Sequence, residues 1–270
     1  MALRSAIINV MAMAADKAGR SLVRDFGEVE QLQVSRKGPA DFVSSADMRA
    51  EKILHNALAQ AHPEFGLLME EGGEIKGSDD RHRWIIDPLD GTTNFLHGLP
   101  HFCISVALER DGQVVAGIVY DPVKDELFWA ERGLGAYVND RRLRVSGRGR
   151  MREGVFATGI PFLGIQDGPG HQKFLGQLGS VMAECAGVRR FGSAALDLAY
   201  VAAGRYDGFW ENGLNPWDVA AGVLLVREAG GLVTDIAGRR YELGAADICA
   251  GNDQLHQPLR NLLRKMPARD

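Results

Sequence analysis

The sequence predicts an α+β fold in which helices and sheets form successive layers. Two features of the 270-residue chain support this prediction. Two amphipathic helical segments precede a run of antiparallel strands, and strands alternate with helices after about residue 153. No Pro- or Ser-rich linker separates an N-terminal half, about 1–150, from a C-terminal half, about 151–270. We therefore expect the two halves to share one interface within a single domain, 1–270.

The N-terminal half begins with the two predicted helices. Apolar residues recur at helical spacing across 3–26, and a second apolar stripe follows Ser44, which is expected to open the second helix. A linker is expected around residues 37–39, which read Lys-Gly-Pro. A short strand is then expected at 66–69.

The middle of the chain has the pattern of an antiparallel meander. Residues 84–86 are typical of a buried strand, and Asp111-Gly112 is a strong hairpin signal. The further strands expected around this turn are 103–110, 113–120, 126–131 and 136–138.

The C-terminal half alternates strands with helices. The expected strands are 154–158, 187–191, 207–211, 232–235 and 247–251. The expected helices are 171–184, 193–203, 216–229 and 253–265. Gly230-Gly231 stops the third of these helices.

Composition excludes several classes of protein. A hydrophobic content of 46% and a net charge of −4 are those of a chain that folds around a core, and they give no electrostatic reason for gross nucleic-acid or membrane binding. The three cysteines are scattered, which argues for a reducing compartment. We find neither a signal peptide nor an apolar run long enough to span a membrane. The sequence therefore predicts a cytoplasmic protein.

Carboxylates stand beside a glycine and an expected helix start in the middle of the chain. Asp87 is expected to end a strand because Pro88 blocks further sheet pairing, and Asp90 is expected to cap a short helix that starts at Gly91. Thr92 would then lie at a helix N-terminus, where free N–H groups favour an anion such as phosphate. Carboxylates repel an anion unless a cation lies between them, and hard oxygen ligands indicate Mg²⁺.

Two further acids have ordinary structural explanations when each is taken alone. Asp218 is expected at the third position of a helix that Asn215 caps and Pro216 begins, where an acid stabilises any helix. Glu70 at a strand end could be a solvated turn residue. Such isolated acids are weak evidence for a metal site, and the evidence comes from the full motifs in which they stand.

Two separated motifs are specific: WIIDPLDGTTN at 84–94 and PWDVAAG at 216–222. With shorter matches at 37–47, 70–71 and 191–200, they resemble the inositol monophosphatase family, most closely its bacterial SuhB-type members. The resemblance covers essentially the whole chain and implies a layered αβαβα sandwich of the sugar-phosphatase type, shared with fructose-1,6-bisphosphatases, and a homodimer. Many members have Gly where this chain has Met69, so the turn before the Glu pair is expected to differ.

The resemblance implies a Mg²⁺-dependent phosphomonoesterase that holds two to three ions. The implied metal ligands are Glu70, Asp87, the carbonyl of Leu89, Asp90 and Asp218. Thr92, with Glu70, would orient the attacking water as catalytic residues, and Asp47 would position Thr92.

The resemblance also implies which residues meet the substrate. Its phosphate would meet the backbone N–H groups of Gly91 and Thr92, and Arg189 or Arg190 could either contact the substrate or hold a structural or interface position. The implied substrate-binding residues are Asp90, Gly91, Thr92, Gly192, Ser193, Ala194, Glu211 and Asp218. Lys37 and Asp41 lie in a segment that is a mobile flap in relatives.

The expected reaction is hydrolysis of myo-inositol 1-phosphate by direct attack of a metal-activated water, with sensitivity to Li⁺. No Cys-x5-Arg motif is present to supply a phospho-enzyme nucleophile. The alternative substrates are other small esters: histidinol phosphate, fructose 1,6-bisphosphate and 3′-phosphoadenosine 5′-phosphate. Glu211 discriminates among them, because a carboxylate suits a polyol better than a second phosphate.

An arginine-rich stretch at 141–152 leaves a function of a different class open. It is either a solvated basic connection or a patch for RNA or a protein partner. SuhB-type relatives are associated with ribosomal-RNA antitermination, so RNA polymerase and Nus factors are candidate partners.

Overall fold

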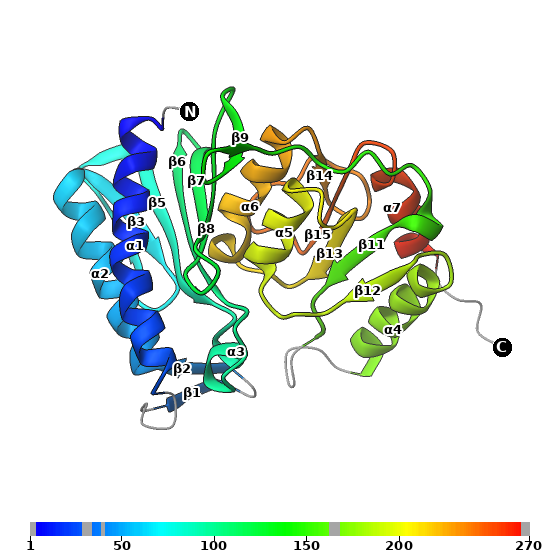
Figure 1. The fold of residues 1–270 in the computed structure, drawn as a ribbon, viewed down its shortest axis with the longest axis horizontal. Coiled ribbons are helices and arrows are strands. Elements are labelled where there is room, and N and C mark those ends of the chain that lie inside the picture. Colours follow the sequence, from blue (N-terminus) through cyan, green and yellow to red (C-terminus); the bar gives the residue numbers. More distant parts are fainter. Residues whose placement is uncertain (1–3, 29–33, 39–40, 162–167, 266–270) are drawn as a thin grey trace.

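The computed structural model describes residues 4–28, 34–38, 41–161 and 168–265 of the chain. Within these residues, three helical layers alternate with two sheets (Figure 1). The helices are, layer by layer, α1 (Ala6–Phe26) and α2 (Ser45–Ala61), α5 (Ala194–Ala202) and α6 (Pro216–Glu228), and α4 (Gly168–Met182) and α7 (His256–Arg264). The layered α+β fold predicted from the sequence is therefore confirmed. None of the described helices has the length and apolar character needed to cross a membrane.

The larger sheet lies between α1/α2 and α5/α6. Its eight strands have the order β10-β9-β8-β7-β6-β5-β3-β4. The strands are β3 (Phe65–Met69), β4 (Gly73–Ile75), β5 (Asp79–Asp90), β6 (Cys103–Arg110), β7 (Gln113–Asp121), β8 (Glu126–Glu131), β9 (Gly135–Val138) and β10 (Arg141–Arg142). All neighbours pair antiparallel except β3 and β5, which are parallel. The predicted meander is confirmed, and its hairpin turn has positive φ at both Asp111 (51°) and Gly112 (73°), as the Asp-Gly signal requires.

The smaller sheet is mixed, which the alternating pattern did not predict. Its order is β12-β11-β13-β15-β14, with β11 parallel to β12 and β13, and β15 antiparallel to both of its neighbours. The strands are β11 (Val155–Thr158), β12 (Gly187–Arg189), β13 (Gly208–Asn212), β14 (Leu232–Thr234) and β15 (Asp247–Gly251). Strand direction depends on the route of each connection, and local periodicity does not encode that route.

The central helices are apolar on every side because sheets cover both of their faces. All nine residues of α5 are buried. Gly222 of α6 brings the two helices together, since a Cβ there would lie 2.6 Å from Leu198 of α5. One core cluster contains residues of both sheets and of both helices, for example Ile85, Leu198 and Phe209. The organisation of 1–270 as a single domain stays a prediction.

The linker predicted around residues 37–39 is wrong for the part that the structure describes. Residues Val34–Gly38 form β1 and Asp41–Ser44 form β2, and the two strands pair antiparallel. Gly and Pro favour a hairpin turn as readily as a linker, so composition did not separate these two outcomes. Residues 39 and 40 lie outside the described residues.

Two local expectations around Asp87 are also wrong. Strand β5 does not end at Pro88 but continues to Asp90, with an irregular register against β6 between Asp87 and Asp90. Because a bulge interrupts the ladder there, the missing N–H of proline removes no hydrogen bond. Helix α3 (Thr92–Leu96) is capped by Gly91 in the left-handed region, φ 99°, and not by Asp90.

Candidate active site

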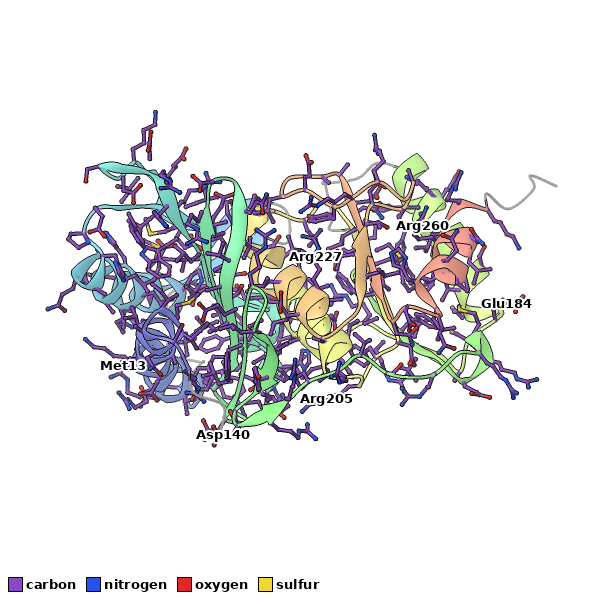
Figure 2. All side chains as sticks on the ribbon, turned by 90° about the horizontal axis from the view of Figure 1, so that it is seen from above. Met13, Asp140, Glu184, Arg205, Arg227 and Arg260 are labelled. Carbon is purple, nitrogen blue, oxygen red and sulfur yellow. The ribbon has the colours of Figure 1, made fainter. Side chains whose placement is uncertain are left out.

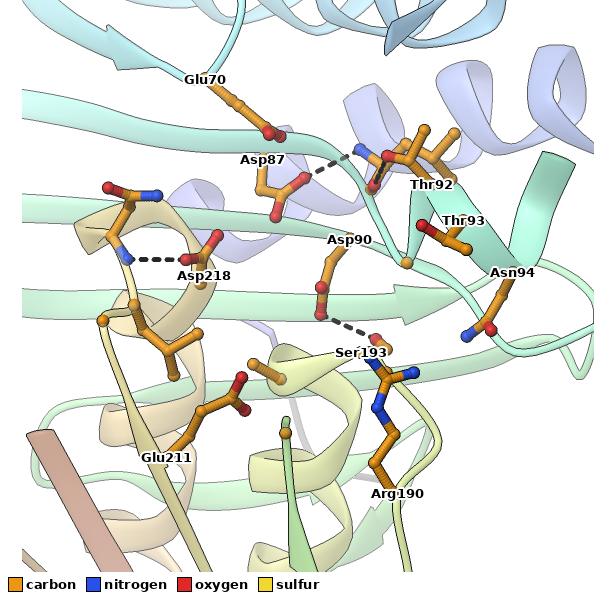
Figure 3. Close-up of a pocket in the computed structure, with 18 residues that line it drawn as sticks. Glu70, Asp87, Asp90, Thr92, Thr93, Asn94, Arg190, Ser193, Glu211 and Asp218 are labelled. Atoms are coloured by element: carbon orange, nitrogen blue, oxygen red, sulfur yellow. Dashed lines mark hydrogen bonds between the residues drawn. The ribbon is translucent and has the colours of Figure 1, made fainter. Parts of the chain in front are cut away.

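A cavity of about 200 Å³ lies where the larger sheet, α3 and the first turns of α5 and α6 meet (Figure 3). It is lined by Glu70, Asp87, Leu89, Asp90, Gly91, Thr92, Thr93, Asn94, Gly159, Arg190, Gly192, Ser193, Ala194, Glu211, Gly213, Leu214, Asn215 and Asp218. Every residue that the sequence singled out as a metal ligand or as a substrate-binding residue is in this set.

Two of the acids are neighbours because their strands are. Met69 of β3 pairs with Ile86 of β5 in parallel, and the Glu70 N–H donates to the Ile86 carbonyl at 3.2 Å. Because β3 and β5 run in the same direction, the residues that follow this pair, Glu70 and Asp87, also lie side by side. Asp218 faces them from the third position of α6, as predicted (Figure 3).

The buried acids repel one another. Burial raises the pKa of Asp87 well above its usual range, and nearby Glu70, Asp90 and Asp218 raise it further. Burial likewise raises the pKa of Asp218, with Asp90 and Glu70 adding to the effect. A cation placed among these groups would offset both the burial and the mutual repulsion of the carboxylates.

The donor set fits a hard cation, because it consists of carboxylate oxygens and one carbonyl oxygen. In the described part of the chain, no three His, Cys, Asp or Glu side chains are grouped closely enough to hold one ion as they stand. Ion binding therefore requires the carboxylates of this cavity to turn toward a common point. The Asp87 carboxylate is partly fixed, since its Oδ1 accepts from the Leu89 N–H at 2.9 Å.

Asp90 joins the two halves of the chain. Its Oδ2 accepts hydrogen bonds from the Ser193 hydroxyl and the Ala195 N–H, both at 2.7 Å. Asp90 thus caps α5, a helix that begins about a hundred residues later, and not the helix that follows it. Burial raises the pKa of Asp90 to about 6, against these hydrogen bonds, which lower it.

Thr92 lies within hydrogen-bond distance of two acceptors. Its hydroxyl is 3.1 Å from Oδ1 of Asp47 and 3.0 Å from the Leu89 carbonyl, and its one proton serves one acceptor at a time. Asp47 is itself held in a capping box at the start of α2, where Oδ2 accepts from the Ser44 N–H at 3.0 Å and from the Ser44 hydroxyl. The structure thus brings Asp47 to Thr92, as the resemblance implied.

Two glycines allow a ligand in the cavity to approach the backbone closely. Gly91 and Gly192 both have positive φ, 99° and 79°. A Cβ at Gly91 would lie 3.0 Å from the His101 carbonyl. These positions keep the backbone N–H groups near the helix starts of α3 and α5 accessible.

Glu211 closes the cavity at the end of β13. Burial and the nearby Asp90 raise the pKa of Glu211 to about 8. A Cβ at Gly159 would overlap the Glu211 carboxylate, so glycine at that position makes room for it. A second phosphate group would meet two acids here, Glu211 and Asp90.

Sequence reasoning assigned no role to two residues near this cavity, Asn94 and Asp197. The Asn94 side chain donates to the His101 carbonyl at 2.7 Å and to the Phe191 carbonyl at 2.6 Å, so it ties α3 to the C-terminal half. Asp197 of α5 is 1% exposed, and its Oδ1 has no hydrogen-bond partner among the residues that the structure describes. The periodicity of α5 gave no signal for Asp197, because a single acid in an apolar helix is a poor predictor of a site.

Three further predictions concern the two arginines, the flap segment and Met69. Of the two arginines left open, Arg190 lines the cavity and Arg189 lies in β12. Lys37 and Asp41 lie in β1 and β2, but their side chains are outside the described part of the structure, so a flap role stays a prediction. Met69 is buried, with its Sδ 3.7 Å from where a Cβ of Gly72 would lie.

The fold and this acidic, glycine-lined cavity define a phosphatase of the layered α+β class. The chain matches the inositol monophosphatase family over residues 3–267. It belongs to that family, whose members are generally metal-dependent.

Named relatives are similar over nearly the whole chain. An inositol-1-monophosphatase of Mesorhizobium japonicum is 58% identical, over 97% of this chain and 97% of its own. A Nus factor SuhB of Escherichia coli is 45% identical over 92% of each chain. The crystal structure of the extragenic suppressor protein SuhB from Bartonella henselae has a TM-score of 0.93 and 60% identity, over 97% of this chain and 99% of its own.

Proposed function

We propose that this phosphatase hydrolyses myo-inositol 1-phosphate to myo-inositol and phosphate, with two to three Mg²⁺ ions. The observation that carries the proposal is the cluster of Glu70, Asp87, Asp90 and Asp218 around buried Asp87, with Glu211 lining the same cavity. The first four would hold the ions together with the Leu89 carbonyl. Glu211, beside Asp90, favours a neutral hydroxyl over a second phosphate.

Bound Mg²⁺ would offset the charge of the phosphate and lower the pKa of a coordinated water. Asp47 accepts the Thr92 hydroxyl proton, which leaves the Thr92 oxygen lone pairs to accept a hydrogen bond from the attacking water. Glu70 would accept the water's proton. The N–H groups of Gly91 and Thr92 would bind the phosphate oxygens, and Gly192, Ser193, Ala194 and Glu211 would face the polyol hydroxyls.

A panel of substrates tests this proposal. We expect myo-inositol 1-phosphate to have the highest kcat/KM in Mg²⁺ when it is compared with histidinol phosphate, fructose 1,6-bisphosphate and 3′-phosphoadenosine 5′-phosphate, and we expect Li⁺ to inhibit. A strong preference for histidinol phosphate or the nucleotide would overturn the substrate, and Li⁺-insensitive hydrolysis would overturn the predicted inhibition. A homodimer and a cytoplasmic location stay predictions.

A second candidate function is binding to the transcription machinery. The basic segment 141–152 remains largely exposed, and Arg144, Arg148 and Arg150 line one open surface cavity. Arg148 has a structural role as well, since it pairs with buried Asp207 at 3.0 Å. The 45% identical relative is named a Nus factor, which supports RNA polymerase or Nus factors as partners of this chain.

The test neutralises the segment without touching Arg148. We expect a triple variant, Arg144→Gln, Arg150→Gln and Arg152→Gln, to lose Nus-factor binding in a pull-down while phosphatase activity stays at the wild-type level. Unchanged binding would count against this function.

A further inference from the structure

A second cavity, separate from the catalytic one, is also lined by residues of α6. It has a volume of about 560 Å³ and is bounded by the β6–β7 turn, α6 and the segment 240–243. Its lining residues are Arg83, Glu109, Gly112, Gln113, Val114, Arg132, Pro216, Val223, Leu224, Arg227, Glu228, Arg240, Tyr241, Glu242 and Leu243. None of them is among the residues of the proposed catalytic site.

Arg227 is the arginine that α6 contributes to this cavity. It is half-buried at the end of α6, where that helix lies against the larger sheet (Figure 2). Burial lowers the pKa of Arg227, and the neighbouring charges of Arg240 and Arg132 lower it further. Arg227 donates a hydrogen bond to the Tyr241 carbonyl at 3.0 Å, and it has no ion pair with a carboxylate in the described part of the chain. Arg240 and Arg132 line the same cavity, and Arg132 donates to the side-chain oxygen of Gln113.

The acids that line the cavity are mostly engaged elsewhere. Glu109 pairs with Arg83 at 2.7 Å. Both oxygens of Glu228 accept backbone N–H groups at 2.9 Å, from Gly133 and Gly135. The remaining acid, Glu242, is exposed.

The rest of the lining includes apolar side chains. Val223 and Leu224 of α6 are buried, and Val114 and Leu243 are partly buried.

We propose that this cavity binds an organic anion that carries a phosphate, phosphonate or carboxylate group on an apolar body. The charged group contacts Arg227, Arg240 and Arg132, and the apolar body lies against Val223 and Leu224. Guanidinium groups suit such oxyanions because they donate paired hydrogen bonds in one plane. The site is separate from the catalytic cavity, although both touch α6.

Phenylphosphonate is a suitable probe, since a phosphatase that cleaves phosphate esters does not cleave its carbon–phosphorus bond. Calorimetric titration of the full-length protein in Mg²⁺ should show binding that is at least tenfold weaker in the Arg227→Gln/Arg240→Gln double variant, because two charge-assisted contacts are lost. The double variant should keep the wild-type kcat and KM. Arg152→Gln removes an exposed arginine outside this cavity and should bind the probe like the wild type.

Three results would overturn the proposal. The first is that substrate displaces all of the probe that the wild type binds. The others are equal binding by the double variant and an equal loss of binding in Arg152→Gln. A matching loss of phosphatase activity in the double variant would place the probe in the catalytic cavity, which also overturns it. Circular dichroism checks the fold, and Arg240→Gln alone, at an exposed position, should weaken binding several-fold if the double variant does not fold.

Discussion

Asp87→Asn is expected to remove nearly all phosphatase turnover while the fold stays intact. The variant loses a buried carboxylate at the centre of the acidic cluster, and with it the charge that would hold Mg²⁺. A loss of ~4 kcal/mol of transition-state stabilisation corresponds to about a thousandfold in kcat/KM. Steady-state kinetics in saturating Mg²⁺ measures this effect, and near-normal activity would contradict the metal assignment.

The same variant has an opposite expectation for the metal-free protein. Glu70, Asp90 and Asp218 all raise the pKa of Asp87, so replacing this acid with a neutral amide relieves repulsion, and Tm without Mg²⁺ should not fall. Added Mg²⁺ should raise the Tm of the wild type through binding to the folded state, and should do so much less in the variant. Asp80→Asn, at an exposed position of the same strand, is the matched control and should behave like the wild type.

Phe102→Ala is expected to lower the free energy of unfolding by about 3–5 kcal/mol, the range for deleting a buried aromatic side chain. Phe102 is fully buried, and its ring lies 5.1 Å from that of Phe26 and 5.0 Å from that of Phe95. The three rings join α1 and α3 to the segment that precedes β6. Loss of the Phe102 ring would leave a cavity beside Gly91, where an added Cβ would lie 3.3 Å from the Cα of Phe102.

Denaturant unfolding measures this change as a shift of the midpoint at an unchanged slope. Leu175→Ala on α4 is the control, because the side chain of Leu175 is 61% exposed and its removal should change stability by less than about 0.5 kcal/mol. A Phe102→Ala midpoint that matches the control would show that the three rings do not stabilise the fold.

Most helices and strands could be predicted from local patterns. The helix start at Ser44, the start of α6 at Asn215 and Pro216, and the Asp111-Gly112 turn are all where the sequence placed them, because each depends on residues at most four apart. The motif at 84–94 also contains two of the acids that line the cavity, Asp87 and Asp90. The roles of those acids stay proposals.

Contacts between distant residues could not be predicted in the same way. Asp90 was expected to cap its own neighbouring helix, but its carboxylate instead binds Ser193 and Ala195, across the boundary between the two halves. The continuation of β5 past Pro88 depends on a bulge against β6, and the mixed direction of the smaller sheet depends on how its connections run. Each of these outcomes involves partners that lie far apart along the chain.

The sequence by itself determined the layered fold class, the order of the main elements and the set of acids that could serve a phosphate site. Helix periodicity, turn chemistry and capping depend on neighbouring residues, so they can be recognised in a single sequence. Only the tertiary structure decided that Asp90 holds α5 and that Arg227, Arg240 and Arg132 line one cavity. The physical reason is that burial and charge at a site depend on which surfaces pack together, and packing is settled between segments that the chain brings together only when it folds.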